Sequence, residues 1–534
     1  MSALRDAGNL TAAPLDGAAM KAWSRWSSVG LSLAIGIALA WLLVFTALTL
    51  FAPIIDSFGF RQTQTAINVY SILHDHAFPL YLTPVLGAPW ALPLEAPVYQ
   101  FFVALLTGAT GLELDAAGRI VSVAFFCGAV WCGARIVALL VPGDWLAPRL
   151  FLLLALASPL YLFWSRTFMV ETCALFFMTA WLMCVIEGSR KRSYALLLLS
   201  VPLCVLGALA KFTSWPAFVA GYGLLGLAEL YRRRTLLTPL ILFGTTGVLV
   251  ALAVGVAWSK YSDDVKVLNT FGAFLTAASL KNWVFGTWAQ RISTALWFDI
   301  VPKRMLWDSL GYGWPALLLC IVCVRPLSRR TVLAVACLVL FLLPIAIFTN
   351  LYMVHDYYAT ANAIFVIAAV GFLLSEVVAA GRPLVAAFVV VVLLAGAAVR
   401  FTAHEWIQAT APLRDNPWYQ AALLVKNSTP PASSLIVFGT DWSSEIPYYA
   451  ERKSVALPGW ATPEQARKFL DDPDALMGGL PIGAVVDCRR GSPNQYPPQL
   501  DVLVTQFIGK WAQHANLVPP TSVPGSCAAY FSPR

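Results

Sequence analysis

The chain has 534 residues, of which 59% are hydrophobic and 12% are charged, and its formal net charge is +8 at pH 7. A mean hydropathy of +0.71 excludes a soluble globular protein and predicts an α-helical polytopic membrane protein. We therefore expect membrane lipid around the chain and no nucleic-acid partner.

The first predicted element is an apolar run over residues 29–51. It is long enough to cross a bilayer core of roughly 30 Å, and it exceeds the apolar stretch of about 7 to 15 residues in a cleaved signal peptide. We expect a retained anchor. Residues 1–28, which carry Lys21 and Arg25, are then a cytoplasmic segment.

A long external loop is predicted next, over residues 52–115. Its stretch FRQTQTAINVYSILHD, which begins at Phe60, interleaves apolar and polar side chains as a helix lying along the membrane surface does. The apolar stretch at residues 96–112 does not fit as a span, because a crossing there would place the later arginine-rich loops outside. We expect it to be a re-entrant or interfacial helix.

Lysine and arginine gather in short loops farther along the chain, and the positive-inside rule makes these loops cytoplasmic. The basic residues are Arg190, Lys191, Arg192, Arg232, Arg233, Arg234, Arg325, Arg329, Arg330 and Arg382. About eleven spans then alternate in direction, with the N-terminus inside and the C-terminus outside. The predicted spans cover residues 29–51, 116–141, 146–164, 167–186, 194–212, 214–231, 236–259, 309–324, 331–354, 357–378 and 383–401.

Ionisable side chains stand at the span ends that are predicted to face outward. A charge costs about 2.5 to 3.5 kcal/mol at mid-bilayer, so such residues tend to be kept for a functional site. They are Asp56, Arg166, Glu171, Lys211, His355 and Asp356. A purely structural histidine is an alternative for His355. Arg119, in contrast, is interpreted as a residue that ends its helix or reaches to the membrane surface.

From residue 402 the chain turns polar and rich in proline, and residues 402–534 predict a small α/β domain on the same side as Asp56. Its short β-type runs are LIVFG, SVALP, GAVVDC and CAAYF. The stretch TPEQARKFLDD predicts a helix that begins with a capping box between Thr462 and Gln465. Cys488 and Cys527, the two cysteines of this tail, are either a disulfide or two unpaired buried thiols.

The sequence contains no P-loop, HExxH, paired CxxC or GxSxG motif. The acid in DSFGFRQTQTA, the SR and E of the Arg166 to Glu171 turn, Lys211 after its span and HDYY at 355–358 resemble the GT-C glycosyltransferases. The most similar branch is the bacterial one that includes lipid A aminoarabinose transferases, with protein O-mannosyltransferases as more distant relatives. Residues 29–401 are then the membrane-embedded catalytic domain.

The resemblance implies transfer of a single sugar from a polyprenyl phosphate such as undecaprenyl phosphate. The acceptor is a lipid-linked or envelope glycan at the outer face of the bacterial inner membrane. Asp56 is implied as the general base of an inverting reaction, and Glu171 as the second acid. The residues implied to bind phosphate or substrate are Arg61, Gln62, Arg166, Lys211, His355, Tyr357 and Tyr358.

Metal use stays open, because some GT-C branches hold a divalent cation with two acids and a histidine and others use none. Asp56, Glu171 and His355 are the candidate ligands here. Two other classes of protein also stay open. A flippase or transporter of a lipid-linked sugar would keep charges in the membrane as well. The second alternative is an anchor whose function resides in the tail.

Overall fold

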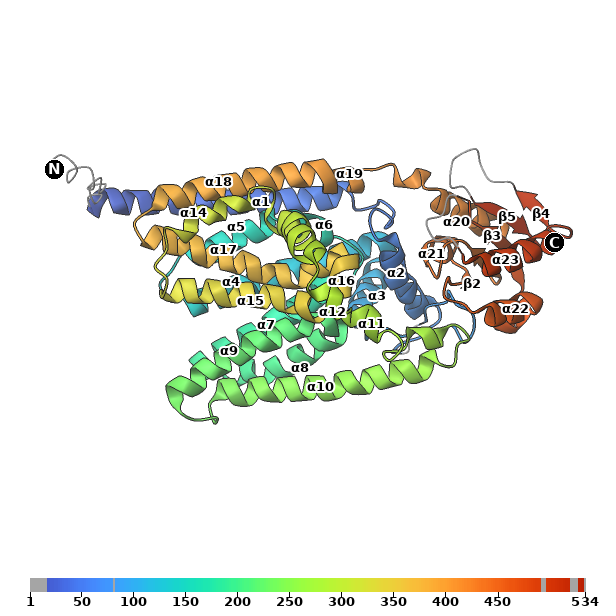
Figure 1. The fold of residues 1–534 in the computed structure, drawn as a ribbon, viewed down its shortest axis with the longest axis horizontal. Coiled ribbons are helices and arrows are strands. Elements are labelled where there is room, and N and C mark those ends of the chain that lie inside the picture. The colour runs from blue at the N-terminus through green and yellow to red at the C-terminus, as the bar shows by residue number, and fades with distance from the viewer. Residues whose placement is uncertain (1–16, 80–81, 491–495, 519–526, 533–534) are drawn as a thin grey trace.

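A computed structural model describes residues 17–79, 82–490, 496–518 and 527–532. A long helical bundle carries a small domain with a β-sheet at one end, and the N-terminal helix begins at the opposite end (Figure 1). The first 16 residues of the predicted cytoplasmic segment lie outside the described residues.

Within the described residues, seven helices are long and apolar enough to cross a membrane, or up to eight if a bent pair forms one span. The seven lie at α1 (Gly17–Leu48), α4 (Leu114–Leu140), α7 (Glu171–Lys191), α10 (Pro239–Lys266), α15 (Arg329–Ile347), α17 (Ala359–Ala379) and α18 (Pro383–Arg400). The bent pair is α8 (Tyr194–Ala210) and α9 (Trp215–Arg233), with a bend of 111°. The protein is thus a polytopic α-helical membrane protein, but the count of eleven spans is not confirmed.

Breaks in the backbone explain part of this difference. The run predicted at 146–164 divides into α5 (Leu146–Ala157) and α6 (Pro159–Trp164), because Pro159 has no N–H to continue the ladder of α5. The run predicted at 309–324 is divided among three short pieces, which are α13 (Trp307–Leu310), η4 (Trp314–Leu317) and α14 (Leu318–Ile321). A hydropathy profile shows both stretches as continuous apolar runs, because it averages composition and does not detect breaks in the backbone.

Short helical segments fill the connections between the long helices. They are η1 (Phe212–Ser214), η2 (Gly272–Leu275), α11 (Lys281–Phe285), α12 (Trp288–Arg291), η3 (Ala295–Leu306), α16 (Thr349–Val354), η5 (Asp356–Tyr358), η6 (Phe401–Glu405) and α19 (Trp406–Ala409). The last two continue α18 toward the tail, so an apolar helical rod runs from Pro383 to Ala409.

The predicted external loop contains two helices, α2 (Gly59–His74) and α3 (Val98–Thr110). α2 forms where expected, but most of it is buried against α3, α4 and the tail instead of lying free on the membrane surface. α3 is an apolar helix of 13 residues that exposes Phe101 and Leu105. Its length fits the prediction of a helix that does not cross the membrane.

Arginine-rich turns lie at the end of the bundle away from the sheet. The α9–α10 and α17–α18 turns are both at that end in Figure 1. Arg325 and Arg330, near the start of α15, both pair with Glu376 at the end of α17, and Arg330 also pairs with Asp144. The bundle therefore has one basic end and one end that carries the tail.

The tail contains a mixed five-stranded sheet in the order β2-β1-β3-β5-β4. Its strands are β1 (Ser434–Phe438), β2 (Lys453–Ala456), β3 (Ile482–Asp487), β4 (Asn516–Val518) and β5 (Ala528–Phe531). β1 runs parallel to β2 and β3, while β5 is antiparallel to β3 and β4. Its helical segments are η7 (Leu413–Asp415), α20 (Pro417–Ser428), α21 (Glu445–Ala450), α22 (Pro463–Asp471), η8 (Pro473–Leu476) and α23 (Pro498–Trp511). All four predicted β-type runs form strands, and β4 was not predicted.

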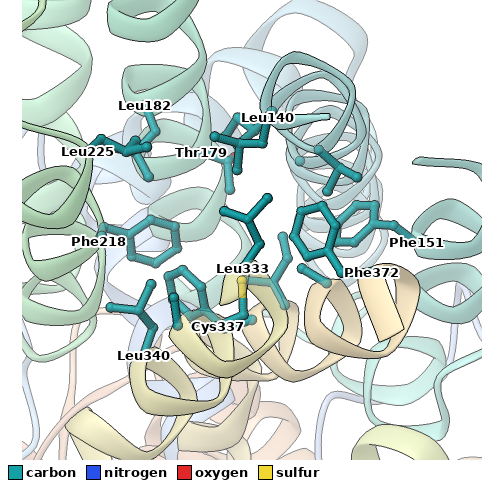
Figure 2. Close-up of a pocket in the computed structure, with 18 of the residues that line it drawn as sticks. Leu140, Phe151, Thr179, Leu182, Phe218, Leu225, Leu333, Cys337, Leu340 and Phe372 are labelled. Carbon is teal, nitrogen blue, oxygen red and sulfur yellow. The ribbon is translucent and has the colours of Figure 1, made fainter. Parts of the chain in front are cut away.

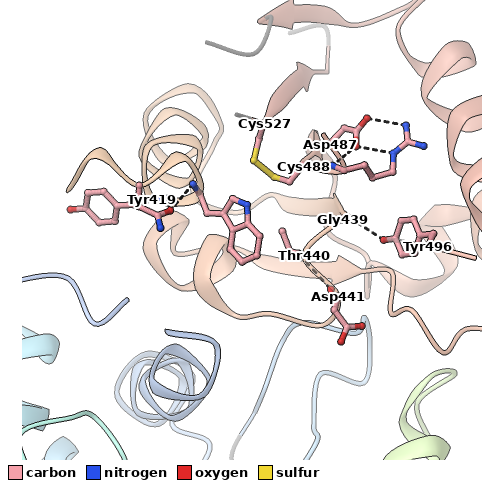
Figure 3. The surroundings of a disulfide bond; sticks show 11 residues. Tyr419, Gly439, Thr440, Asp441, Asp487, Cys488, Tyr496 and Cys527 are labelled. Atoms are coloured by element: carbon pink, nitrogen blue, oxygen red, sulfur yellow. Dashed lines mark hydrogen bonds and ion pairs between the residues drawn. A yellow bond between two sulfur atoms is a disulfide. The ribbon is translucent and has the colours of Figure 1, made fainter. Parts of the chain in front are cut away.

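Two local features of the tail follow from its sequence. Thr462 caps α22 through the expected capping box, in which its side chain and that of Gln465 each accept the other residue's backbone N–H. Cys488 and Cys527 form a disulfide that links the end of β3 to the start of β5 (Figure 3).

Backbone hydrogen bonds attach the tail to the external loop. The Ala456 N–H donates to the Val85 carbonyl at 2.7 Å, and the Ser454 N–H donates to the Pro84 carbonyl at 2.9 Å. The Gly87 N–H donates back to the Ser454 carbonyl at 3.1 Å. The segment around Val85 therefore extends the sheet beyond β2 and covers that edge, which fixes the tail over the bundle.

Candidate functional site

Asp56 lies in the loop between α1 and α2, and its side chain has no exposed surface. One carboxylate oxygen lies 2.7 Å from Nη2 of Arg166 and 3.7 Å from Nη1 of Arg119. The other accepts hydrogen bonds from the Gln62 side chain at 2.7 Å and from the Ser57 N–H at 3.0 Å. Burial by itself would raise the pKa of Asp56, but Arg166, Arg119 and Gln62 hold it below its usual value. Asp56 is an ionised carboxylate, and both of its oxygens have partners.

Arg166 comes from the turn between α6 and α7 and is completely buried. Its guanidinium carbon lies 4.8 Å from the ring centre of Phe45 and 4.7 Å from that of Phe163, and such contacts stabilise a buried cation. Its Nε and Nη1 atoms have no hydrogen-bond partner among the described residues. The structure thus buries Arg166 against Asp56.

The position of Arg119, inside α4, contradicts the prediction that this residue ends a helix or reaches to the membrane surface. Its side chain is fully buried, and it donates to the carbonyls of Ala52 at 3.2 Å and Pro53 at 3.4 Å. It therefore holds the start of the Asp56 loop as well as facing the carboxylate. Because Arg166 is also present, two cations meet one carboxylate here.

Gln62 was predicted to contact substrate, but in the structure both polar atoms of its side-chain amide form hydrogen bonds within the protein. Its Nε2 donates to Asp56 and, at 2.8 Å, to the Ser57 carbonyl, while its Oε1 accepts from the Phe168 N–H at 3.0 Å. Gln62 is fully buried. It thus ties the Asp56 loop to the turn that precedes Glu171.

A second cluster contains Arg61, Lys211 and two carboxylates. Arg61 pairs with Glu95, and both side chains are partly exposed. Lys211, at the bend between α8 and α9, pairs with Glu171 at the first position of α7, and each side chain is only 2% exposed. Burial would lower the pKa of Arg61, but Glu95, Tyr357 and Glu171 hold it above its usual value.

Aromatic rings complete this cluster. The Lys211 Nζ lies 4.2 Å from the ring centre of Tyr358 and 5.0 Å from that of Tyr357. Arg61, Lys211, Tyr357 and Tyr358, which the sequence implied as phosphate or sugar ligands, are therefore neighbours. Together they offer cations and hydroxyl groups suited to a phosphate ester.

His355 lies beside the same rings but does not add a positive charge. Its ring stacks on Tyr358 at 5.7 Å between centres, and its Nδ1 is a buried atom with no partner in the described part of the chain. Burial and the charges of Lys211 and Arg61 lower the pKa of His355 to about 4. At neutral pH it is therefore a neutral hydrogen-bond donor or acceptor.

The candidate metal ligands do not come together. Asp56 faces Arg166 and Arg119, while Glu171 faces Lys211. Across the described residues, no group of three or more His, Cys, Asp and Glu side chains is placed to hold a metal ion. The residues in this arrangement do not fit a metal bound by Asp56, Glu171 and His355.

Aromatic side chains separate the two clusters and border a polar cavity. Phe58 and Trp164 both pack on Tyr357, with ring centres 5.1 Å and 5.8 Å away. Trp164 and Ser57 also line a cavity of about 300 Å³. The other residues around this cavity include Arg304, Trp307, Asp308, Tyr312, Asp356, Arg400, His404, Glu405 and Gln408. Indole rings, carboxylates and amides of this kind suit a polar sugar.

A different cavity, of about 120 Å³, lies inside the bundle between α4, α5, α7, α9, α15 and α17. Phe151, Phe218, Leu333 and Phe372 point into it, and Thr179 is the one labelled residue there with a hydroxyl group (Figure 2). That hydroxyl donates to the Leu175 carbonyl at 2.8 Å. The cavity is suited to hydrocarbon and carries no catalytic groups.

Glu445, which was not singled out from the sequence, brings a carboxylate of the tail to the start of α2. A Cβ atom placed at Gly59 would lie 2.6 Å from the Glu445 Oε1. Burial raises the pKa of Glu445 to about 7. The tail therefore presses a poorly solvated carboxyl group against the helix that carries Arg61.

This raised pKa gives the first prediction. Because the pKa of Glu445 is higher in the folded than in the unfolded state, wild-type stability falls as pH rises from about 4.3 to about 7. Glu445→Gln removes this penalty and is expected to stabilise the protein by roughly 3 kcal/mol at pH 8, with little effect at pH 4. Thermal unfolding of both proteins in detergent at the two pH values measures it. A stability difference that does not change with pH would contradict the prediction.

No protein-family model and no curated protein matches the sequence. The fold does match solved structures. The structure of ArnT from Cupriavidus metallidurans in the apo state is 12% identical, with a TM-score of 0.56 over 92% of this chain and 97% of that chain.

Two further matches are similar. The same enzyme bound to undecaprenyl phosphate is 14% identical, with a TM-score of 0.54 over 92% of this chain and 98% of that chain. Arabinofuranosyltransferase AftD from Mycobacteria is 14% identical, with a TM-score of 0.50 over 93% of this chain and 40% of that chain. The chain therefore has the fold of the GT-C glycosyltransferases, as its sequence resemblance predicts.

Proposed function

We propose that the chain is a membrane glycosyltransferase that moves a single sugar, with inversion, from a polyprenyl-phosphate donor to a lipid-linked or envelope glycan acceptor. The observation that carries this proposal is the position of a buried carboxylate, Asp56, and of two cations, Arg61 and Lys211, in a GT-C fold at the end that carries the tail. In the proposal this end faces the periplasm of a bacterial inner membrane. The basic end and the N-terminus face the cytoplasm.

The donor phosphate is assigned to Arg61 and Lys211. Arg61 has five N–H donors, and among the described residues its side chain donates to Gln64 and Glu95. Lys211 has three donors and one carboxylate partner, Glu171. Donors therefore remain for phosphate oxygens without loss of either ion pair. ArnT in its undecaprenyl-phosphate structure binds a lipid of the class proposed here.

In the proposed reaction the acceptor hydroxyl oxygen bonds to the anomeric carbon of the sugar while the bond from that carbon to the phosphate oxygen breaks. The leaving polyprenyl phosphate takes the electron pair, and Arg61 and Lys211 stabilise its charge. Asp56 accepts the hydroxyl proton. Because Asp56 is closed in by Arg166 and Gln62, the acceptor has to displace one of these contacts.

The acceptor is assigned to the cavity that Ser57, Trp164 and Trp307 line. Ser57 is the residue next to Asp56, so an acceptor in this cavity lies beside the loop of the base. Trp164 also contacts Tyr357, which belongs to the cluster of Arg61 and Lys211. Donor and acceptor then meet beside the Trp164 ring.

A gene-deletion strain, complemented with the wild-type gene or with an empty vector, tests the proposal. Mass spectrometry of envelope glycans and glycolipids is expected to show one species that differs by the mass of a single sugar. The mass difference identifies the sugar, and the modified species identifies the acceptor. Identical profiles in both strains, with the wild-type protein present in the membrane, would contradict the proposed transfer.

A further inference from the structure

The tail domain reaches the Asp56 loop through two tyrosines of α21. The Ile54 N–H donates to the Tyr449 hydroxyl at 2.7 Å, and that hydroxyl donates to Oδ2 of Asp115 at 2.9 Å. The neighbouring Tyr448 hydroxyl donates to Oδ1 of Asp115 at 2.6 Å. Asp115 belongs to the first turn of α4, so one carboxylate of the bundle fixes both hydroxyl groups of the tail.

The bond to Ile54 acts on the backbone close to Asp56. One residue, Ile55, separates Ile54 from Asp56, so their Cα atoms are at most about 7 Å apart along the extended chain. Arg119 holds the carbonyls of Ala52 and Pro53, and Tyr449 is the group that accepts the Ile54 N–H. Ile54 is completely buried. Its N–H would lose its acceptor without the Tyr449 hydroxyl, and a buried unpaired N–H is unfavourable enough to move the loop.

We propose that Tyr449 is a positioning residue through which the tail domain fixes the Asp56 loop in its working geometry. The effect on sugar transfer rests on the function proposed above, whereas the effect on the loop does not. The tail is then part of the site, because the position of the Asp56 carboxylate depends on the hydrogen bond between Ile54 and Tyr449, which the bundle alone cannot make. Small displacements of a reacting group are costly for catalysis.

Tyr448 provides a matched control. Tyr448 and Tyr449 are adjacent, both come from α21, and each donates one hydrogen bond to Asp115. The Ile54 N–H donates to Tyr449. Tyr449→Phe and Tyr448→Phe therefore remove the same hydroxyl group and one bond to the same carboxylate, but only the first leaves the Ile54 N–H without its acceptor.

Hydrogen exchange of the full-length protein in nanodiscs measures the loop directly. Tyr449→Phe is expected to speed exchange of the Ile54 amide by about tenfold or more, while Tyr448→Phe stays within about threefold of wild type. Equal exchange in the two variants would overturn the proposal. If Tyr449→Phe fails to accumulate, the wild type still tests the bond, since an Ile54 N–H held by the Tyr449 hydroxyl is expected to exchange at least about tenfold more slowly than an unpaired amide. Exchange of the wild-type Ile54 amide at the rate of an unpaired amide would also overturn the proposal.

Transfer and lipid binding test the positioning role. In the complemented deletion strain, Tyr449→Phe is expected to lower the sugar-bearing product on the order of 10- to 100-fold, with Tyr448→Phe close to wild type. Affinity for undecaprenyl phosphate should stay unchanged in both, because Arg61 and Lys211 are untouched. Faster loop exchange with normal product would overturn the role of Tyr449. If wild type itself forms no product, the proposed function fails, and the exchange measurement still decides whether Tyr449 holds the loop.

Discussion

Asp56→Asn is expected to lower the sugar-bearing product in the complemented deletion strain by about 100-fold or more, because a general base contributes roughly 10²- to 10⁴-fold to a rate. An amide cannot accept the hydroxyl proton, although it can keep the bond from Arg166. The measurement is the mass-spectrometric product level, divided by the amount of folded protein in the membrane. Product within about threefold of wild type would show that Asp56 is not the base.

This variant also removes charge from a buried site. Arg166 and Arg119 both lie against Asp56 without exposed surface, and loss of one partner from a buried ion pair costs about 3 to 5 kcal/mol. Product loss could then reflect unfolding, so a control with a similar structural defect is needed. Thermal unfolding and size-exclusion profiles of both proteins provide the comparison.

Glu376→Gln is that control. Glu376 has no exposed side-chain surface and faces two arginines, Arg325 at 2.6 Å and Arg330 at 3.5 Å. It lies at the basic end of the bundle, away from the tail. Its arginine partners are 60% and 28% exposed, so the variant is expected to destabilise the protein less than Asp56→Asn does and to keep transfer per folded molecule. Loss of transfer in both variants would assign the effect of Asp56→Asn to stability instead of proton transfer.

The same pair of variants separates a transferase from a flippase. A flippase of lipid-linked sugars moves its cargo without a general base, so Asp56→Asn would keep lipid movement and envelope composition would follow protein abundance alone. The arrangement of the charges favours the transferase. The Asp56 loop and α2, which carries Arg61, lie against the tail, whereas carriers place their sites near the middle of the membrane.

Local rules in the sequence predicted local features well. The capping box of Thr462 needs only four residues, and the β-type runs in the tail need only five or six, so both are visible without knowledge of distant contacts. The prediction that Arg61, Lys211, Tyr357 and Tyr358 lie together came from the family resemblance. It also used the alternation of the predicted spans, which assigns each loop to one side of the membrane.

The features that were missed depend on backbone breaks or on distant contacts. Pro159 divides a run that hydropathy treats as one span. Arg119, an isolated charge in an apolar run, was predicted to end its helix or to reach to the membrane surface. The same isolation in an apolar run is a signal for a buried site, and the structure places it against Asp56. Tyr448 meets Asp115 across 333 residues, and no pattern in one sequence reports that contact.

Lys211 and Glu171 give the second large expected effect. Both side chains are 2% exposed, so Lys211→Met leaves a buried carboxylate without its cation and is expected to lower the free energy of unfolding by about 3 to 5 kcal/mol. The double variant Lys211→Met/Glu171→Gln removes both charges and is expected to recover most of that loss. Unfolding in denaturant of the wild type, the single variant and the double variant measures it. A single variant as stable as wild type would contradict the burial of the pair.

The double variant then isolates the binding role of Lys211. A hydrogen bond to a charged group is worth about 1.5 to 3 kcal/mol, so loss of the ammonium is expected to weaken undecaprenyl phosphate binding by roughly 10- to 150-fold. Tyr358, whose ring lies 4.2 Å from the Lys211 Nζ, stays in place in this variant. A stable protein with weakened binding assigns the lipid phosphate to Lys211 as well as to Arg61. Wild-type affinity in the double variant would leave Arg61 as the phosphate ligand and limit Lys211 to holding Glu171 at the start of α7.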